Sequence, residues 1–261
     1  MYVFLTLTSL LTLVTVLAVA VRLRNSLRNV RGDIQRVRKE IRAIRSENKQ
    51  LVKAASSLAK ESVNATGITA LGFRFPVFMG GWSIDTHFGR YLIQHLLEYR
   101  PKCILELGSG SSTIIVARTL QLLGSSNETS HLAVDHEERY LEITREVSRL
   151  NGVQKEVEFL HCPLEKFASV DKLWYGGLIE RLADRKVDFL IVDGPPGPLQ
   201  PLSRYPALPL LAPHLAEHCT ILLDDAGRDD EREIARLWVS ENPGFELTFS
   251  REGHGLAILR R

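Results

Sequence analysis

The sequence predicts an α/β protein whose doubly wound sheet is mostly parallel and ends in an antiparallel hairpin. After about residue 84, short apolar runs alternate with helix-like stretches, which is the pattern of repeated β-α-β units. The last two apolar runs are separated only by a short loop around Glu-Gly-His-Gly, as in a hairpin. A long uncharged run and a heptad pattern precede this part, so the chain of 261 residues is expected to carry an appendage.

Each element of the predicted sheet corresponds to one stretch of the sequence. The five parallel strands are expected at residues 103–107, 131–135, 157–161, 187–193 and 220–224. The helices are expected at residues 111–123, 138–151, 204–216 and 229–240, and the hairpin strands at 245–250 and 256–260. Because β-α-β crossovers place helices on both faces of a sheet, the parallel strands are expected to be buried on both sides.

Residues 2–21 form the uncharged run near the N-terminus. At about 1.5 Å per residue, about twenty helical residues span the roughly 30 Å of a bilayer core. Four arginines follow directly: Arg22, Arg24, Arg28 and Arg31. Positive residues stay on the cytoplasmic side, so the rest of the chain is expected there. A cleaved signal peptide is the alternative, but no basic residue precedes the run. We therefore expect a single-pass transmembrane anchor at residues 1–22.

A heptad pattern follows the anchor and predicts a coiled-coil stalk at residues 23–66. Position a holds Leu27, Ile34, Ile41, Asn48 and Ala55, and position d holds Leu23, Val30, Val37, Ile44, Leu51 and Leu58. A single Asn at position a is a known means of fixing a parallel two-stranded register. Opposite charges flank the seam, with Asp33 and Glu40 at g positions and Arg38 and Arg45 at e positions. We expect a homodimer, and the alternative is an amphipathic helix that packs on its own domain.

The overall composition excludes some classes of function. Hydrophobic residues make up 44% of the chain, which is enough for a real core, and the net charge is +2. The positive charge is concentrated in the stalk, so nucleic-acid binding is a poor inference. Cys103, Cys162 and Cys219 lie in apolar segments without metal-ligand spacing, and we expect free thiols in the core.

Acidic residues stand at the carboxyl ends of the predicted strands. Glu106 ends the first strand, Asp135 the second and Asp193 the fourth, while Asp224 and Asp225 end the fifth. Ligands of such sheets bind at the carboxyl ends of the strands. One acid at a solvated strand end is unremarkable, but acids at four of these ends together predict a site for a cation, a polyol or a metal.

The string CILELGSGSSTI reads as a strand, a glycine turn and the start of a helix. Gly108 and Gly110 allow a tight turn and a close approach of backbone to ligand. The dinucleotide fingerprint requires a third glycine where Thr113 stands, so this is not that motif. Instead an acid, Glu106, lies two residues before the first glycine.

This arrangement resembles motif I of the class I S-adenosylmethionine-dependent methyltransferases. The resemblance extends from about residue 82 to the C-terminus and includes VDHE, VDFLIVDGPPG, ILLDDAGR and the final hairpin. The third glycine that is usual in the family is Ser112 here. The resemblance implies a Rossmann-like enzyme domain at residues 67–261 with S-adenosylmethionine as its cofactor.

The resemblance also assigns roles to individual residues. Gly108 and Gly110 would line the methionyl part of the cofactor, and Glu106 would orient its amino group. Asp135 would accept hydrogen bonds from both ribose hydroxyls, with Glu137 as the alternative. The usual acid after the third strand is replaced by HCPL, so Cys162 or its backbone is left for the adenine contact. The implied cofactor-binding residues are Glu106, Gly108, Ser109, Gly110, Ser112, Asp135, His136, Cys162 and Asp193.

A metal site is a further implication, because catechol-type O-methyltransferases place acids at equivalent strand ends. Asp193, Asp224 and Asp225 would bind Mg²⁺ through oxygen and polarise an acceptor hydroxyl. Two features depart from these families. Pro196 stands where the catechol-type enzymes have a lysine, three residues after the first Asp, and the histidine that related sugar O-methyltransferases have in this loop is missing. The alternative is that Asp193 contacts cofactor or acceptor and Asp225 caps a helix. The expected catalytic residues are Asp193 and, in the hairpin loop, His254.

The predicted function is O-methylation of a small hydroxylated, saccharide or lipid-linked acceptor at a membrane. Two alternatives remain open. The proline-rich segment after Asp193 has a faint similarity to aminopropyltransferases, although their paired acids are lacking here. A membrane-tethered dimeric scaffold that retains only a cofactor-binding fold would show the same sequence features.

Overall fold

The computed structural model describes residues 2–81, 83–125 and 127–261, with side chains from residue 12 onward. The chain divides into two compact units, Met1–Lys60 and Glu61–Arg261. Helix α1 (Tyr2–Thr69) belongs to both of them without a break. The predicted boundary between anchor and stalk is therefore continuous helix, and the helix ends at Thr69, shortly before Gly72 turns the chain with a φ of +71°.

The apolar stripe of α1 is exposed in the single chain. Leu27 and Ile41, two of the predicted seam residues, are 64% and 43% exposed. The helix is thus present, while its pairing with a second copy stays a prediction. In the described part of the chain no helical stretch is long and apolar enough to span a bilayer. Residues 1–11 of the predicted anchor lie outside the residues whose side chains are described.

The second unit contains a seven-stranded sheet with strand order β3-β2-β1-β6-β7-β9-β8. Its strands are β1 (Cys103–Leu107), β2 (Ser130–Asp135), β3 (Glu158–His161), β6 (Val187–Val192), β7 (Leu215–Asp224), β8 (Glu246–Ser250) and β9 (Leu256–Arg260). The first five run parallel, and β9 lies antiparallel between β7 and β8. The predicted doubly wound sheet with a terminal hairpin is confirmed.

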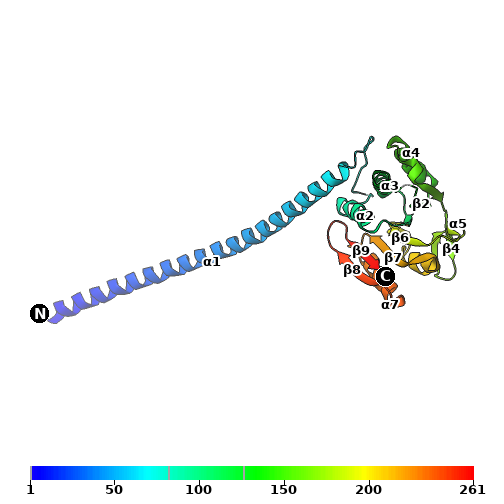
Figure 1. Ribbon diagram of the computed structural model, residues 1–261. Coiled ribbons are helices and arrows are strands. Elements are labelled where there is room, and N and C mark those ends of the chain that lie inside the picture. Colours follow the sequence, from blue (N-terminus) through cyan, green and yellow to red (C-terminus); the bar gives the residue numbers. More distant parts are fainter. Residues whose placement is uncertain (1, 82, 126) are drawn as a thin grey trace. The chain divides into compact units, whose positions relative to one another are not determined.

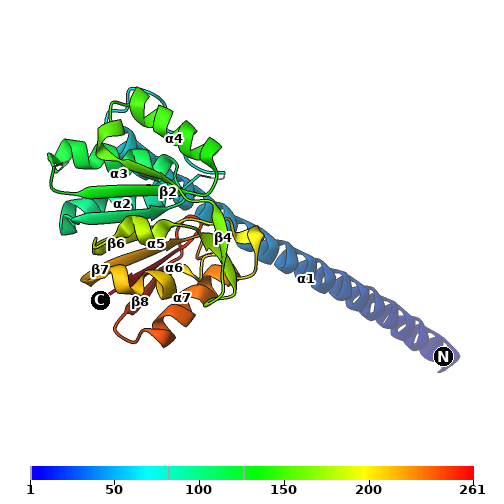
Figure 2. The same ribbon diagram turned by 90° about the vertical axis from the view of Figure 1, so that its right-hand side faces the viewer.

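Helices cover both faces of this sheet (Figures 1 and 2). On one face lie α2 (Thr86–Tyr99), α3 (Ser111–Leu123) and α4 (Glu138–Leu150), and on the other lie α5 (Leu178–Leu182), α6 (Ala207–Leu211) and α7 (Asp229–Glu241). The alternation along β1 explains the two layers, because Ile104 packs in one core cluster while Leu105 and Leu107 pack in the other. All five residues of β1 are buried, as expected of a central parallel strand.

Helix α2 was not among the predicted elements. Asp85 caps it by accepting a hydrogen bond from the Phe88 backbone N–H at 2.8 Å, and the buried face repeats every four residues with Phe88, Leu92 and Leu96. The helix packs on Ile68, in the last turn of α1. A Cβ at Gly89 would lie 2.8 Å from the terminal methyl group of Ile68, so that side chain would have to shift to admit a larger residue.

The structure also differs from the sequence prediction after β3 and between β6 and β7. A small hairpin, β4 (Leu164–Phe167) with β5 (Lys172–Tyr175), follows β3 where no strand was predicted. β4 is half polar, and β5 has only three apolar residues in a row, so neither strand shows a long apolar run. The helix predicted at residues 204–216 is only one turn of helix, α6, followed by a 3₁₀ turn. Pro213 ends the helical stretch, because it has no N–H to donate.

Candidate active site

Gly108 is the point where β1, β2 and β6 meet. Its N–H donates to Val134 O at 2.9 Å, while the N–H of Asp193 donates to Leu107 O at 2.9 Å. Gly108 has a φ of +96°, and a Cβ on it would lie 3.0 Å from the carbonyl carbon and oxygen of Asp193. Only glycine fits this crossing, since any side chain would be strained and would press on the backbone of β6.

Gly110 lies beside open space at the start of α3. Its N–H donates to Thr113 Oγ1 at 3.0 Å, which fixes the entry to the helix. No described atom lies within 4 Å of the position that a Cβ of Gly110 would take. Ser112 is buried in the first turn. The predicted glycine turn therefore has an open side at a helix N-terminus, where backbone N–H groups lack helical partners.

Asp135 binds the glycine turn through both carboxylate oxygens. Oδ2 accepts from the N–H (3.2 Å) and the hydroxyl (2.8 Å) of Ser109, and Oδ1 accepts from Glu137 N–H at 3.1 Å. His136 Nδ1 lies 3.4 Å from Oδ1. Burial raises the pKa of Asp135, but hydrogen bonds from His136, Glu137 and Ser109 outweigh it and leave the pKa below its ordinary value. A ribose contact by this ionised carboxylate requires that one of these donors gives way.

His136 and Glu137 follow directly at the same sheet edge. His136 Nε2 lies 3.5 Å from Glu137 Oε1, and the imidazole edge faces the ring of Tyr175 at 6.4 Å between centroids. The Glu137 carboxylate is half exposed, so it has lone pairs available to a ligand. The alternative assignment of the ribose contact to Glu137 therefore fits the geometry at least as well as Asp135.

Glu106 is fully buried, and only one of its two carboxylate oxygens has a hydrogen-bond partner in the described part of the chain. Its Oε2 lies 3.0 Å from Nε2 of His131, which is also buried, on the neighbouring strand β2. Its Oε1 has no hydrogen-bond partner in the described part of the chain. A buried carboxylate oxygen without a partner is costly, so it suits a donor that is supplied by a ligand. This fits the predicted contact with the cofactor's ammonium group.

Cys162 is a free thiol of the core, as the sequence predicts. Its side chain is buried in the core, where burial raises the pKa of the thiol, and its N–H already donates to Asp135 O at 2.9 Å. Neither group is left for an adenine ring, so the predicted contact through the thiol or the backbone N–H is not supported. Cys162 lies between β3 and β4, and its side chain packs in the same core cluster as Trp174 and Tyr175 of β5.

Arg204 is the residue that organises the acidic strand ends. Its Nη2 lies 3.0 Å from Asp193 Oδ1 and 3.0 Å from Asp225 Oδ2, and its Nη1 donates to Asp224 O at 3.0 Å. The Arg204 side chain is only 4% exposed. A second cation, Arg228, approaches Asp225 Oδ2 at 2.9 Å. Arg204 follows the proline loop and Arg228 follows Asp225 in the sequence, so pairing of these arginines with the acids was the predicted alternative to a metal, and the structure shows this pairing.

These contacts correct the predicted metal site. The guanidinium of Arg204 stands between Asp193 and Asp225, so these acids do not fit a Mg²⁺ site together with Asp224. Asp224, Asp225 and His254 form a group of three in which one ligand atom of each lies within 4.8 Å of the others. Asp225 in that group already pairs with two arginines. Cationic side chains therefore neutralise the acids where a metal was predicted.

The pKa of Asp193 is raised from the ordinary value of an aspartate to near neutral pH. Burial raises the pKa of Asp193 most, Arg204 lowers it, and the negative charges of Asp225 and Glu106 raise it again, so that it reaches about 7. The pKa of Asp224 lies well above its ordinary value for the same first reason. Asp193 is thus a carboxylate at the glycine turn that can hold or release a proton near pH 7.

His254 lies at the same edge of the sheet but apart from Asp193. Its side chain is 41% exposed, and Nδ1 is 4.0 Å from Asp225 Oδ1. The backbone fixes the loop, because His254 O accepts from Gly227 N–H at 2.8 Å and His254 N–H donates to Asp85 Oδ2. The structure therefore places His254 near the acids, as predicted, without a contact to Asp193.

Tyr175 is a site residue that the sequence did not reveal. It ends β5, is fully buried, and its hydroxyl finds no hydrogen-bond partner among the described residues. A Cβ on Gly194, next to Asp193, would lie 2.3 Å from the Tyr175 oxygen. No pattern could have indicated this residue, since the strand that places it was itself not predicted.

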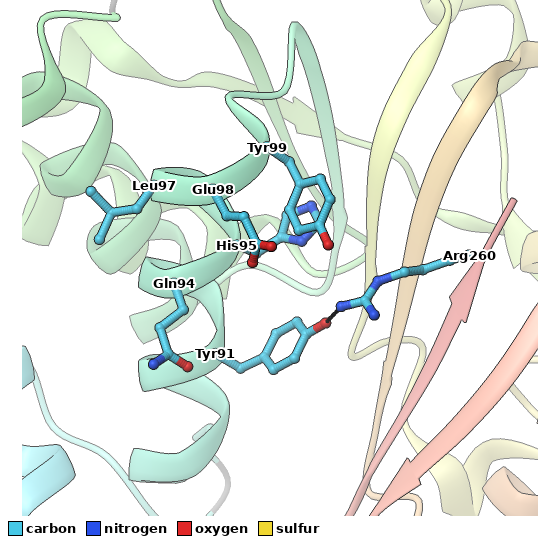
Figure 3. Close-up of a pocket in the computed structure, with 7 residues that line it drawn as sticks. All are labelled: Tyr91, Gln94, His95, Leu97, Glu98, Tyr99 and Arg260. Carbon is cyan, nitrogen blue, oxygen red and sulfur yellow. Dashed lines mark hydrogen bonds between the residues drawn. The ribbon is translucent and has the colours of Figure 1, made fainter.

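A separate surface pocket of about 450 Å³ lies along α2 (Figure 3). It is lined by Tyr91, Gln94, His95, Leu97, Glu98, Tyr99 and Arg260. Arg260 pairs with Thr220, whereas the strand end at Asp224 pairs with Leu256. The pocket therefore lies at the other end of the sheet from the glycine turn, and it contains none of the predicted site residues.

Comparison with known proteins agrees with this geometry. Residues 105–226 match the family model of a methyltransferase domain. The O-methyltransferase from Bacillus cereus in complex with SAH is 16% identical, with a TM-score of 0.52, and the match covers 78% of this chain and 90% of that chain. The SAH-bound methyltransferase PaMTH1 from Podospora anserina is 14% identical, with a TM-score of 0.52, over 69% of this chain and 80% of that one. No curated protein matches the chain.

The family match begins in β1, contains the glycine turn, and ends just after the acids of β7. It therefore covers nearly every residue of the candidate site, while the hairpin loop with His254 lies beyond it. The matched region, residues 105–226, is accordingly a methyltransferase domain.

Proposed function

We propose that the enzyme methylates a hydroxyl oxygen of a small hydroxylated, saccharide or lipid-linked acceptor, with Asp193 as the general base. The observation that carries this proposal is the placement of Asp193. Its backbone touches Gly108 of the glycine turn, its side chain is largely buried, and its pKa is raised to about 7. A carboxylate that titrates near neutral pH is suited to take a proton from an alcohol during a reaction.

The residues present fit S-adenosylmethionine. Glu106 offers a buried oxygen without a partner, which complements an ammonium group, and Gly110 leaves open space beside the turn. Ser109 and Asp135 hold that turn in place, with Glu137 exposed at its rim. When bound, the cofactor supplies a methyl group that is already activated for transfer. The protein is left to align the acceptor and to accept one proton.

Asp193 would accept that proton from the acceptor hydroxyl. The O–H bond would break, the proton would go to the Asp193 carboxylate, and the oxygen would keep the electron pair that forms the new bond to the methyl carbon. The bond from that carbon to the sulfur of the cofactor would break at the same time, with its electron pair left on sulfur. Arg204 holds the carboxylate through Oδ1, which leaves Oδ2 for the hydroxyl. His254 remains the alternative base, but its 4.0 Å neighbour is Asp225 and not Asp193.

We further propose that the enzyme works as a parallel dimer at a membrane, with its catalytic domain in the cytoplasm. The support for the dimer is the exposed apolar seam of α1 together with the charges that flank it. Asp33 and Glu40 at g positions complement Arg38 and Arg45 at e positions of a second copy. The support for the anchor is the uncharged run at residues 2–21, followed by arginines.

The experiment that tests the activity uses the full-length chain purified in detergent. It is incubated with S-adenosylmethionine labelled in its methyl group and with an extract of its source organism, and the labelled product is identified by mass spectrometry. Label in a methyl ether supports transfer to a hydroxyl oxygen, whereas label in a methyl ester would point to a carboxyl acceptor and contradict it. Label on nitrogen or carbon, transfer of an aminopropyl group, or binding of SAH without any transfer would contradict it, and the last result would favour a scaffold.

The membrane and dimer proposals have their own tests. The protein should stay in the membrane fraction after alkaline extraction, and a chain that begins at Leu23 should not. Cross-linking through a cysteine introduced at Leu27 should join two copies, whereas a cysteine at the exposed Arg28, off the seam, should not. Release by alkali, or equal cross-linking at both positions, would contradict the respective proposal.

A further inference from the structure

We propose that the hydroxyl of Tyr175 is a hydrogen-bond donor to the ribose of the bound cofactor. This inference rests on the proposed function, because it assigns a further binding residue to the same site. It starts from a conflict in the structure: the Tyr175 side chain is fully buried, yet its hydroxyl has no partner among the described residues. A buried hydroxyl without a partner costs roughly 1–3 kcal/mol, so such groups are rare unless a ligand or water satisfies them.

The position of this hydroxyl points to the cofactor side of the sheet edge. Tyr175 ends β5, and Gly176 N–H donates to Pro163 O at 2.8 Å, which holds the strand end close to the end of β3. The Tyr175 oxygen contacts Gly194, whose own Cβ position would be 3.2 Å from the Cα of Gly108. The hydroxyl therefore lies directly against the glycine turn, between the ends of β2 and β6.

The surroundings define what kind of atom the hydroxyl can meet. Burial raises the pKa of Tyr175 well above its ordinary value. Asp135 and Asp193 raise this pKa further and Arg204 lowers it, so on balance the hydroxyl keeps its proton and donates. Both carboxylates are close enough to act on it, yet neither accepts its hydrogen bond. Negative charge on two sides repels the carboxylate of a ligand. A neutral ribose oxygen is the acceptor of the cofactor that fits this place.

The same placement explains why Gly194 and the small hairpin are needed. Any side chain at Gly194 would collide with the Tyr175 oxygen, so glycine there keeps the hydroxyl at the turn. The ring is held from behind by Trp174, with 5.5 Å between centroids, and from the side by His136. Tyr175 is thus fixed in one orientation before a ligand arrives, which lowers the entropic cost of the contact.

The test compares Tyr175→Phe with Tyr91→Phe in the full-length chain. Tyr175→Phe removes one oxygen and keeps the buried ring. Tyr91→Phe is the matched control, because its hydroxyl contacts Arg260 in the pocket at the other end of the sheet (Figure 3). Calorimetry measures the Kd for SAH and for methylthioadenosine, which keeps the ribose and lacks the amino-acid part. A thermal melt without ligand shows whether each variant is folded.

We expect Tyr175→Phe to weaken both ligands by the same factor, about three- to tenfold, as for one neutral hydrogen bond. Tyr91→Phe should leave both Kd values unchanged. Unchanged binding to a folded Tyr175→Phe variant would overturn the inference, and so would a loss for SAH without a loss for methylthioadenosine. If the wild type binds neither ligand, the result contradicts the proposed function. If the wild type binds both ligands and Tyr175→Phe binds them equally well, the result contradicts only the role of Tyr175.

A second measurement keeps the inference testable if Tyr175→Phe does not fold. The wild-type chain is titrated with SAH and with its 2′-deoxy and 3′-deoxy ribose analogues. One of the analogues should bind about three- to tenfold more weakly than SAH. Where the variant does fold, that preference should be smaller in it, because only the ribose contact of Asp135 or Glu137 remains. Equal binding of all three ligands to the wild type would contradict a ribose contact of this kind.

Discussion

Arg204 Nη2 lies 3.0 Å from Oδ1 of Asp193 and also 3.0 Å from Oδ2 of Asp225. One buried cation therefore links the carboxyl ends of β6 and β7. A cation held by hydrogen bonds in this position lets two acids approach without a metal, and it leaves Asp193 with a pKa near 7 and not far higher. The chemistry of the site follows from this balance of burial and charge.

The first prediction concerns the pH dependence of activity. A general base must be deprotonated, so the rate of methyl transfer should rise with pH through about 7 as Asp193 loses its proton. Arg228 lowers the pKa of Asp193. Arg228→Gln should therefore move the midpoint of the rate profile to higher pH. Arg236→Gln, on the solvent side of α7, is the control and should leave it in place. A midpoint that is the same in all three proteins would show that another group controls the profile.

The second prediction concerns metal removal. Because Arg204 and Arg228 neutralise Asp225, activity should be the same before and after treatment with a chelator, and added Mg²⁺ should not raise it. Initial rates with and without the chelator measure this. Loss of activity that returns with Mg²⁺ would mean that Arg204 gives way to a cation in the working enzyme.

The third prediction separates the two glycines of the turn. Gly108→Ala places a methyl group 3.0 Å from backbone atoms of Asp193 at a positive φ, so it should reduce the free energy of unfolding by about 1–3 kcal/mol. Gly110→Ala meets open space, so the fold should remain stable while SAH binding weakens. Denaturant unfolding and calorimetry measure the two effects. Equal loss of stability in both variants would contradict the described turn.

The fourth prediction concerns stability at low pH. Burial, with a smaller contribution from Arg260, lowers the pKa of His95 to about 4. The unfolded chain binds this proton below about 6.5 and the folded chain does not, so stability falls as pH falls. Between pH 7 and pH 5 this group should cost about 2 kcal/mol. His95→Gln should reduce that difference, as measured by urea unfolding at both pH values. An unchanged difference would show that His95 is charged in the fold.

The sequence predicted the elements that have strong one-dimensional patterns. The ranges of β1 and α3 agree to the residue, because an apolar run, a glycine turn and a helical repeat follow one another there. The β4–β5 hairpin was missed because Glu165 and Lys166 interrupt any apolar pattern. Tyr175 was missed with it. At residues 204–216 the predicted helix is only partly present. The apolar residues favour a helix there, but Pro213 ends it.

The chemistry of the acids could be predicted only in part. Their places at the strand ends follow from the order of the elements, and the structure brings Asp193 and Asp225 together as expected. What fills the space between them depends on Arg204, which is 21 residues from Asp225 in the sequence. Which groups occupy a shared space depends on side-chain packing across the sheet edge, and no spacing rule encodes it.

The most direct test of the central claim is Asp193→Asn. The change keeps the shape of the side chain and removes the base, so methyl transfer should fall by about 10²- to 10⁴-fold while the Kd for SAH stays within about threefold of the wild type. His254→Asn, assayed beside it, should keep most of the activity. Full transfer activity in Asp193→Asn, with the same dependence of rate on pH as the wild type, would contradict the assignment of Asp193 as the base.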